Sequence, residues 1–226
     1  ATLIEGIDKS LGDLMDHVAN KGVAENTLIL FVGDNGSDAP LGDTYGYFSS
    51  APLRGKKGTC YEGGMRVPFI ASWAKAGKAN PFNIARNHLH HEQIGTVMDI
   101  YSTIVDASNS NSPAKHPVDG VSLLPQLSGR INEERPDHFM CHFPHSHRSS
   151  YFTSFRKGDW KLIYRYLTSA GKRKSKQQLP KHELYNLKND PYETKNLALG
   201  NDKKIKEMIG LMKRQLKEEN ALLPDK

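Results

Sequence analysis

One segment of the chain combines residue types that bind anions. Residues 52–68 read PLRGKKGTCYEGGMRVP, with four glycines, two adjacent lysines and two arginines directly before an apolar run. Glycines let the main chain approach a ligand closely, and lysine supplies a compact positive charge for one oxygen of an oxyanion. The alternative is a surface loop with solvated cations. The segment indicates an anion-binding loop, its spacing alone does not separate Lys56 from Lys57, and the residue order of a phosphate-binding P-loop is absent.

A second segment offers ligands for a hard metal ion. Asp34-Asn35-Gly36 follows the apolar run TLILFV at 27–32. A carboxylate beside an amide carbonyl provides two oxygen ligands of the kind that calcium or magnesium prefers. The alternative is a hairpin turn, for which Asn-Gly is common. The residues that follow, SDAPLGDTYGYFSSAP, do not read as a returning strand, so the metal-ligand interpretation is favoured.

Histidines and cysteines form a third group of reactive residues. The stretch HFPHSH holds His142, His145 and His147, whose spacing matches no closed zinc site. Substrate contact or acid–base work is one interpretation, and ordinary hydrogen-bonded surface histidines are the other. The two cysteines, Cys60 and Cys141, could form one disulfide, but two free buried thiols are the expectation.

The first half of the chain has the element pattern of an α/β domain. Apolar residues recur every three or four positions from Leu3 to Val18, which predicts a helix that ends before Gly22. The runs at 27–32 and 67–73 are nearly continuous in apolar residues, as in strands of a parallel sheet that are buried on both faces. A second helix is predicted from about residue 92 to residue 107.

The second half has a different character, and we place a domain boundary at residue 130. Two alternating runs around Gly158 and Asp159 predict an antiparallel hairpin over 151–166, and ELYNL at 183–187 predicts a further strand. Apolar positions from Ile205 to Leu216 predict a terminal helix. The expected organisation is an α/β domain over 1–130 and a small α+β subdomain over 131–226.

The charge distribution points to an anionic partner. The net charge of the chain is +6, and it divides into −2 for residues 1–130 and +8 for residues 131–226. Nucleic acid, a sulfated or phosphorylated glycan and a membrane surface are all compatible with a basic second half. No apolar run approaches the roughly 20 residues that a membrane-spanning helix needs.

Taken in order, the motifs resemble those of the type I sulfatases, the formylglycine-dependent branch of the alkaline-phosphatase-like superfamily. The segments that carry the resemblance are TLILFVGDNG, LRGKKGTCYEGGMRVPFIASW, TVMDIYSTIVDASN, DGVSLLPQLSG, FRKGDWKLIY and ELYNLKNDPYETKNLA. They cover almost the whole chain. The resemblance implies a mixed sheet flanked by helices, followed by a small subdomain with an antiparallel sheet and a terminal helix.

The resemblance also assigns roles to individual residues. It implies that Asp34 and Asn35 ligate calcium, with magnesium a weaker alternative, and that Lys57 holds a sulfate oxygen. It places His142 and His145 where related enzymes have substrate-contacting residues. It therefore implies a hydrolase of sulfated carbohydrate or aryl sulfate esters, with neither a nucleic-acid partner nor a membrane span.

One departure from the family pattern is large. The family nucleophile is a formylglycine made within a Cys/Ser-x-Pro-Ser-Arg motif, and this chain holds no such motif. We therefore expect the chain to be the C-terminal part of a sulfatase, inactive alone, whose N-terminal part supplies the nucleophile. The family also implies a periplasmic, secreted or lysosome-like location. Two alternatives stay open, namely a phosphodiester or phosphonate ester hydrolase of the same superfamily and a non-catalytic module that binds anionic glycans.

Overall fold

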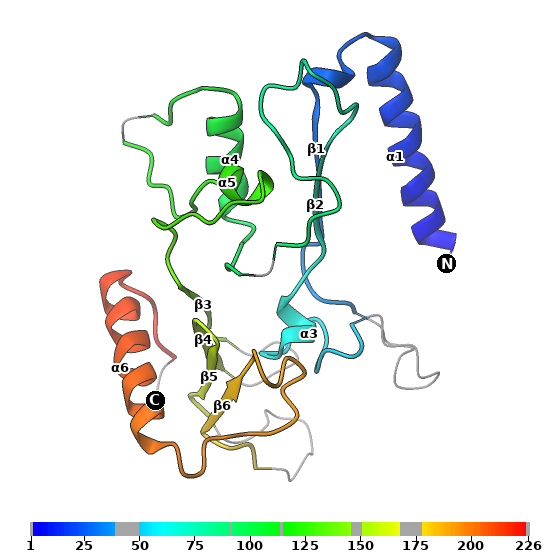
Figure 1. The fold of residues 1–226 in the computed structure, drawn as a ribbon. Coiled ribbons are helices and arrows are strands. Elements are labelled where there is room, and N and C mark those ends of the chain that lie inside the picture. Colours follow the sequence, from blue (N-terminus) through cyan, green and yellow to red (C-terminus); the bar gives the residue numbers. More distant parts are fainter. Residues whose placement is uncertain are drawn as a thin grey trace. The chain divides into compact units, whose positions relative to one another are not determined.

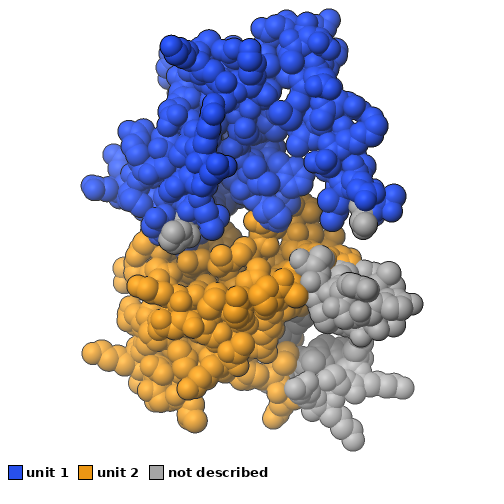
Figure 2. All heavy atoms as spheres, turned by 45° about the vertical axis from the view of Figure 1, so that its right-hand side comes forward, with its two compact units in different colours: residues 1–33, 68–135 blue, residues 34–67, 136–226 orange. Residues whose placement is uncertain are grey.

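The chain forms two compact units. The computed structural model describes residues 2–38, 50–90, 92–113, 115–145, 151–167 and 178–224. Unit 1 comprises Ala1–Gly33 and Pro68–Arg135, and unit 2 comprises Asp34–Val67 and Pro136–Lys226 (Figure 2). The segment Asp34–Val67 thus makes its contacts within unit 2, and the predicted domain boundary at residue 130 stays a prediction.

Unit 1 contains an antiparallel strand pair with helices (Figure 1). Its elements are α1 (Thr2–Asn20), η1 (Ala24–Asn26), β1 (Leu28–Val32), β2 (Phe69–Trp73), α4 (Asp99–Ala107) and α5 (Leu124–Leu127). The predicted first helix is confirmed, and Gly22 follows its end with a φ of 72°, a conformation that glycine adopts without strain.

The prediction of parallel strands buried on both faces is wrong for the described residues. β1 and β2 pair antiparallel, with Leu28 opposite Trp73 and Val32 opposite Phe69. The Gly33 N–H donates to the Pro68 carbonyl oxygen at 3.1 Å, so the chain leaves β1 and enters β2 at the same end. An apolar run reports which side chains face away from water, and it does not report strand direction.

The second predicted helix begins later than residue 92. The structure starts α4 at Asp99, because residues 94–99 are held in another arrangement. The Asp99 carboxylate accepts the Thr96 N–H at 2.6 Å and pairs with Arg135 at 2.8 Å, and the Arg135 guanidinium also donates to the Ile94 carbonyl oxygen. These bonds replace the intrahelical bonds that the periodicity predicted.

Unit 2 contains a four-stranded antiparallel sheet in the order β3-β4-β5-β6. Along the chain, one helix precedes these strands and one follows them. Its elements are α3 (Glu62–Met65), β3 (His138–Phe143), β4 (Phe152–Lys157), β5 (Trp160–Arg165), β6 (His182–Asn186) and α6 (Asp202–Glu218). The predicted hairpin, the strand predicted at 183–187 and the predicted terminal helix are confirmed. The prediction did not include β3 as a strand.

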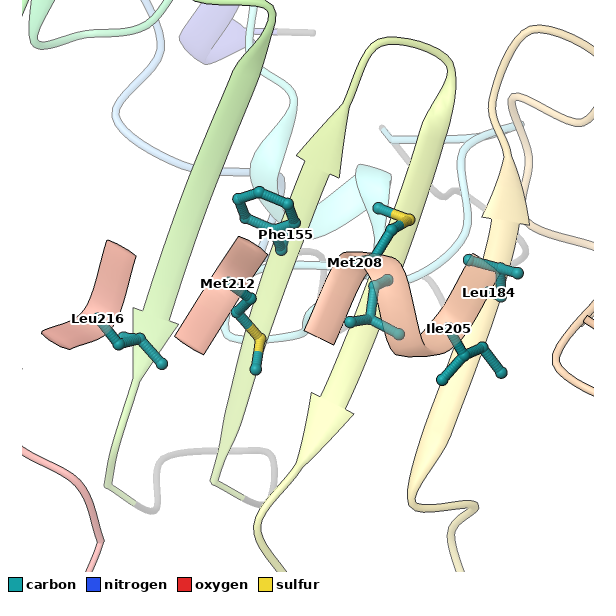
Figure 3. Close-up of a cluster of buried hydrophobic side chains, with 7 residues drawn as sticks. Phe155, Leu184, Ile205, Met208, Met212 and Leu216 are labelled. Atoms are coloured by element: carbon teal, nitrogen blue, oxygen red, sulfur yellow. The ribbon is translucent and has the colours of Figure 1, made fainter. Parts of the chain in front are cut away.

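The two faces of this sheet have different coverings. Strand side chains alternate between faces, and one set meets the apolar side of α6 (Figure 3). The resulting core consists of Phe155, Leu162, Leu184, Ile205, Met208, Met212 and Leu216. The opposite face is covered by residues 54–62, which pack Cys60 and Tyr61 against Phe152, Ile163 and Tyr185.

No helix in the described ranges is long and apolar enough to cross a membrane. The exposed apolar side chains include several on α1, which has no buried residue.

Candidate active site

The Asp34-Asn35-Gly36 turn presents oxygen atoms in a fixed arrangement. The Asn35 N–H donates to Asp34 Oδ1 at 3.0 Å, and Asn35 Nδ2 donates to the Gly36 carbonyl oxygen at 3.0 Å. The amide nitrogen is therefore used within the turn, which leaves the Asn35 side-chain oxygen available. Asp34 is exposed and Asn35 is half-buried.

This turn packs against the main chain of α3 at a distance that only glycine allows. The Gly36 N–H donates to the Gly64 carbonyl oxygen at 3.0 Å. A Cβ atom at Gly36 would lie 2.0 Å from the Gly63 carbonyl oxygen, and one at Gly63 would lie 2.6 Å from the Arg54 carbonyl oxygen. The glycines of the two segments thus permit contact between the Asp34-Asn35-Gly36 turn and the anion-type loop, by which we mean residues 52–61 and the start of α3.

The structure separates Lys57 from its neighbour. The Lys57 N–H donates to the Ser37 carbonyl oxygen at 2.9 Å, which joins this lysine directly to the residue after the Asp34-Asn35-Gly36 turn. Lys56 instead closes a local turn, in which its carbonyl oxygen accepts the Thr59 N–H and hydroxyl at 3.0 and 2.8 Å. Lys57 is half-buried, and no carboxylate within the described ranges forms an ion pair with its ammonium group.

The two predicted substrate histidines have different surroundings. His142 lies on the α6 face of the sheet, opposite Thr153 in the neighbouring strand. Its Nδ1 is 2.7 Å from the Thr153 hydroxyl and its Nε2 is 2.7 Å from the Leu222 carbonyl oxygen. Because a carbonyl oxygen only accepts, Nε2 donates, and Nδ1 is occupied by the Thr153 hydroxyl, so both nitrogens are used internally.

His145 follows β3 and is exposed. Its ring stacks on Phe143, with 3.9 Å between centroids, and it lines an open hollow of about 430 Å³ together with Tyr151 and Leu222. The roles of His142 and His145 in substrate binding stay predictions. The observed contacts of His142 favour a structural role.

Sequence reasoning missed a set of buried charges beneath the anion-type loop. Lys161 is 1% exposed; its ammonium donates to Glu62 Oε1 at 2.9 Å and forms an ion pair with Glu193 Oε1 at 2.8 Å. Beside it, Arg165 forms a buried ion pair with Glu183. Lys161, Arg165 and Glu183 occupy strand positions whose alternation with apolar residues resembles a solvent-facing pattern. The available signal was the presence of complementary charges in YEGGMR, WKLIYR and HELYN.

Arg54 connects the loop to this charged face. Its guanidinium donates to the Tyr185 hydroxyl and to the Glu193 carbonyl oxygen, both at 2.9 Å, and it stacks over the Tyr61 ring at 3.9 Å from the centroid. The Tyr61 hydroxyl in turn donates to the Glu183 carboxylate at 3.1 Å. The loop is therefore fixed to the sheet by charge-assisted hydrogen bonds.

The pKa values of two glutamates in this network, Glu62 and Glu193, are shifted in opposite directions. Burial opposes ionisation of Glu62, but Lys161 and Arg66 outweigh it and hold the Glu62 pKa below its ordinary value. Burial raises the pKa of Glu193, and the attraction of Lys161 does not cancel it. The network therefore stabilises the charge of Glu62 more than the charge of Glu193.

Both cysteines are free thiols, as expected. Burial raises the pKa of Cys60 to about 11, and burial also raises the pKa of Cys141. A thiol with such a pKa stays protonated at neutral pH and is a weak nucleophile. Neither cysteine has the surroundings of a catalytic nucleophile.

The donor set suits part of a calcium site. The Asp34 carboxylate and the Asn35 amide oxygen are hard oxygen ligands, and calcium takes six to eight of these. No group of three or more histidine, cysteine, aspartate or glutamate residues that could hold a metal occurs in the described ranges. The turn would thus hold the ion together with ligands from elsewhere.

Comparison with known proteins identifies the family. The sulfatase family model matches residues 1–110. A sulfatase of Formosa agariphila is 30% identical over 220 residues, which cover 89% of this chain and 35% of that protein. The chain belongs to the sulfatase family. The N-acetylgalactosamine-6-sulfatase of Mus musculus is 32% identical over 59% of this sulfatase chain and 24% of that protein.

The fold of the sulfatase chain also matches a solved structure. A protein solved in complex with its substrate D-glucosamine-2-N,6-O-disulfate has a TM-score of 0.67 and 25% identity, over 96% of this chain and 40% of that one. The predicted alkaline-phosphatase-like fold class is therefore confirmed. The chain spans roughly a quarter to two fifths of the length of these relatives.

Proposed function

We propose that this chain is the C-terminal part of a sulfatase that hydrolyses sulfate esters of carbohydrates, with aryl sulfates as a second substrate class. The observation that carries the proposal is the hydrogen bond from the Lys57 N–H to the Ser37 carbonyl oxygen, which joins the cationic loop to the Asp34-Asn35 turn. Membership of the sulfatase family supports it, as does a related protein whose substrate is a disulfated glucosamine.

The proposed roles follow from the chemistry of each group. Asp34 and Asn35 provide oxygen ligands for calcium, which would supply positive charge beside the sulfate when bound. Lys57 provides a cation for a sulfate oxygen. No carboxylate in the described ranges pairs with its ammonium group, so that charge is available. Charge that accumulates on the transferring group is then stabilised by a preorganised cation, which is a large contribution in such reactions.

The nucleophile lies outside this chain in the proposed enzyme. No Cys/Ser-x-Pro-Ser-Arg motif occurs in the sequence, and both cysteines are buried thiols with raised pKa values. We place a formylglycine nucleophile in the N-terminal part of the full-length protein. The family resemblance also supports a periplasmic, secreted or lysosome-like location.

The experiment compares ester classes in the full-length protein that contains this chain. Sulfate release is measured from sulfated amino-sugar saccharides and from p-nitrophenyl sulfate, and phosphate release from p-nitrophenyl phosphate and a phosphonate monoester. We expect sulfate esters to react faster by at least 100-fold. Faster reaction of the phosphorus esters would assign the protein to the alternative activity, and binding of sulfated saccharides without release would identify a binding module.

A further inference from the structure

The anion-type loop packs against buried charged side chains. Apolar side chains at these positions would avoid the free-energy cost of removing charges from water. Lys161 is 1% exposed and Glu193 is fully buried, at 0%. The Lys161 ammonium lies within 2.9 Å of carboxylate oxygens from both Glu62 and Glu193. Each of the three groups comes from a different segment: α3, β5, and the turn after β6. The cluster thus joins three segments at one point.

Glu62 is the residue through which this cluster holds the loop. It is the first residue of α3, and its N–H donates to Glu193 Oε2 at 2.6 Å. Its two carboxylate oxygens are taken by Lys161 at 2.9 Å and by Arg66 at 2.8 Å. Main chain and side chain of Glu62 are therefore both fixed, and Lys161 and Glu193 are the buried members that fix them.

The main chain of α3 then contacts both predicted functional segments. The Gly64 carbonyl oxygen accepts the Gly36 N–H at 3.0 Å, and the Gly63 N–H donates to the Arg54 carbonyl oxygen at 2.7 Å. A Cβ at Gly64 would lie 2.6 Å from the Lys56 carbonyl oxygen, so the loop rests directly on the helix. A shift of α3 would therefore move the Asp34-Asn35 turn and the lysine loop together.

The conformation of Glu193 is a further sign that this arrangement is constrained. Its φ is 54°, in the left-handed region that side chains other than glycine, asparagine and aspartate rarely adopt. Such strained residues persist where the surrounding structure fixes them, often at functional sites. Buried ion pairs also contribute less stability than well-packed apolar groups of similar volume. Placement of the loop is a role that fits both observations.

We infer that Lys161 and Glu193 are positioning residues, which hold α3 so that Lys57 and the Asp34-Asn35 turn stay together in the geometry that binds sulfate and metal. This inference rests on the proposed function for what is bound. The coupling of the two segments through α3 can be measured without any activity.

The first test measures that coupling by amide hydrogen exchange in the full-length protein. Lys161→Met removes the buried cation with little change of shape. We expect exchange at the Lys57 and Gly36 amides to become at least 10-fold faster, because their bonds to Ser37 and Gly64 lose a fixed support. The matched control is Lys157→Met, since Lys157 pairs at 2.8 Å with Asp137, which is 62% exposed. Unchanged exchange at both amides in Lys161→Met would overturn the inference.

A second pair of variants guards against a Lys161→Met protein that does not fold. Glu193→Gln keeps an oxygen that accepts the Glu62 N–H, and Glu193→Ala removes it. We expect Glu193→Ala to accelerate exchange at the Lys57 and Gly36 amides at least 10-fold and Glu193→Gln less than 3-fold. Equal exchange rates in the two variants would contradict the role of Glu193.

The third test separates positioning from general stability by steady-state kinetics. We expect Lys161→Met to raise KM for a sulfated substrate and the calcium concentration for half-maximal activity, each at least 5-fold. Met208→Ala is the control, because Met208 lies on the buried face of α6 and its truncation should lower stability without touching the loop. If Lys161→Met lowers thermal stability as Met208→Ala does and leaves KM and the calcium requirement unchanged, the residue is only structural.

The outcomes also distinguish failure of the two claims. A wild-type protein that hydrolyses no sulfate ester contradicts the proposed function, and the exchange experiment still tests the positioning. If the protein is active but the exchange rates of the Lys57 and Gly36 amides do not change in the Lys161 and Glu193 variants, the proposed function stands and the positioning role is refuted.

Discussion

The Lys57 N–H donates a hydrogen bond to the carbonyl oxygen of Ser37, 20 residues earlier in the chain, at 2.9 Å. This bond places the lysine of a glycine-rich loop beside the turn that carries Asp34 and Asn35. It gives a physical reason to assign the anion-binding role to Lys57, whereas Lys56 uses its main chain to close a turn with Thr59.

Replacement of Gly36 by alanine should disrupt this arrangement. The new Cβ would lie 2.0 Å from the Gly63 carbonyl oxygen and 2.7 Å from the Gly64 Cα, and these are main-chain atoms that cannot rotate away as a side chain would. We expect Gly36→Ala to lower the free energy of unfolding by about 3 kcal/mol or more, as measured by urea denaturation.

Gly210 offers the matched control for that substitution. It lies within α6, and a Cβ there would have no neighbour within 4 Å. Gly210→Ala should raise the free energy of unfolding by about 0.5–1 kcal/mol, because alanine favours the helix. Equal effects of the two substitutions would show that the contact of Gly36 with α3 does not exist in solution.

The charge of Glu62 should make stability depend on pH. Its pKa is depressed in the folded protein, so its contribution is present above its ordinary pKa of about 4.5 and is lost as the pH falls through the lower folded value. Glu62→Gln removes one of the two carboxylates that pair with the buried Lys161, and at pH 7 it should cost about 3–5 kcal/mol. The difference from wild type should shrink below about pH 4.5.

Urea denaturation at pH 7 and at pH 4 measures this difference. Glu207→Gln serves as the control, since Glu207 forms an exposed pair with Lys204 at 3.1 Å, and exposed pairs contribute about 0–1 kcal/mol. A Glu62→Gln cost that is the same at both pH values would refute the depressed pKa.

The two thiols should be unreactive in the folded protein. Burial raises the pKa of Cys60 to about 11, so only about one thiol in a thousand is ionised at pH 8, and the pKa of Cys141 is raised as well. Reaction with a chromogenic disulfide at pH 8 should release no thiol product within minutes from the native chain. It should release two equivalents after denaturation, and a fast equivalent from the native chain would contradict the burial of these residues.

Hydrophobic periodicity was enough to predict the elements that carry a single apolar face. The alternation around Gly158 predicted β4 and β5, and the spacing from Ile205 to Leu216 predicted α6, because each buries one apolar face. The direction of β1 relative to β2 could not be predicted from its apolar run. The antiparallel pairing of these strands, and the bond between the Gly33 N–H and the Pro68 carbonyl oxygen at its end, are main-chain contacts that leave no pattern in side-chain types.

The residues proposed to bind metal and sulfate could be selected from the sequence, but the buried charged residues that hold their loop in place could not. Asp34, Asn35 and Lys57 followed from their chemistry and from the family resemblance. Lys161 could not be found in the same way, because a lysine between apolar residues in a strand indicates a side chain in water. Here the facing surface is the loop itself, so burial of Lys161 depends on a contact with Glu62, which is 99 residues away in sequence.

The most direct test of the central claim compares Lys57→Met with Lys56→Met in the full-length protein that contains this chain. The measurement is kcat/KM for release of sulfate from a sulfated amino sugar in the presence of calcium. If Lys57 holds a sulfate oxygen during transfer, Lys57→Met should lower kcat/KM by about 100- to 1,000-fold and Lys56→Met by less than about 5-fold. Full activity of Lys57→Met, or a larger loss in Lys56→Met, would contradict the account.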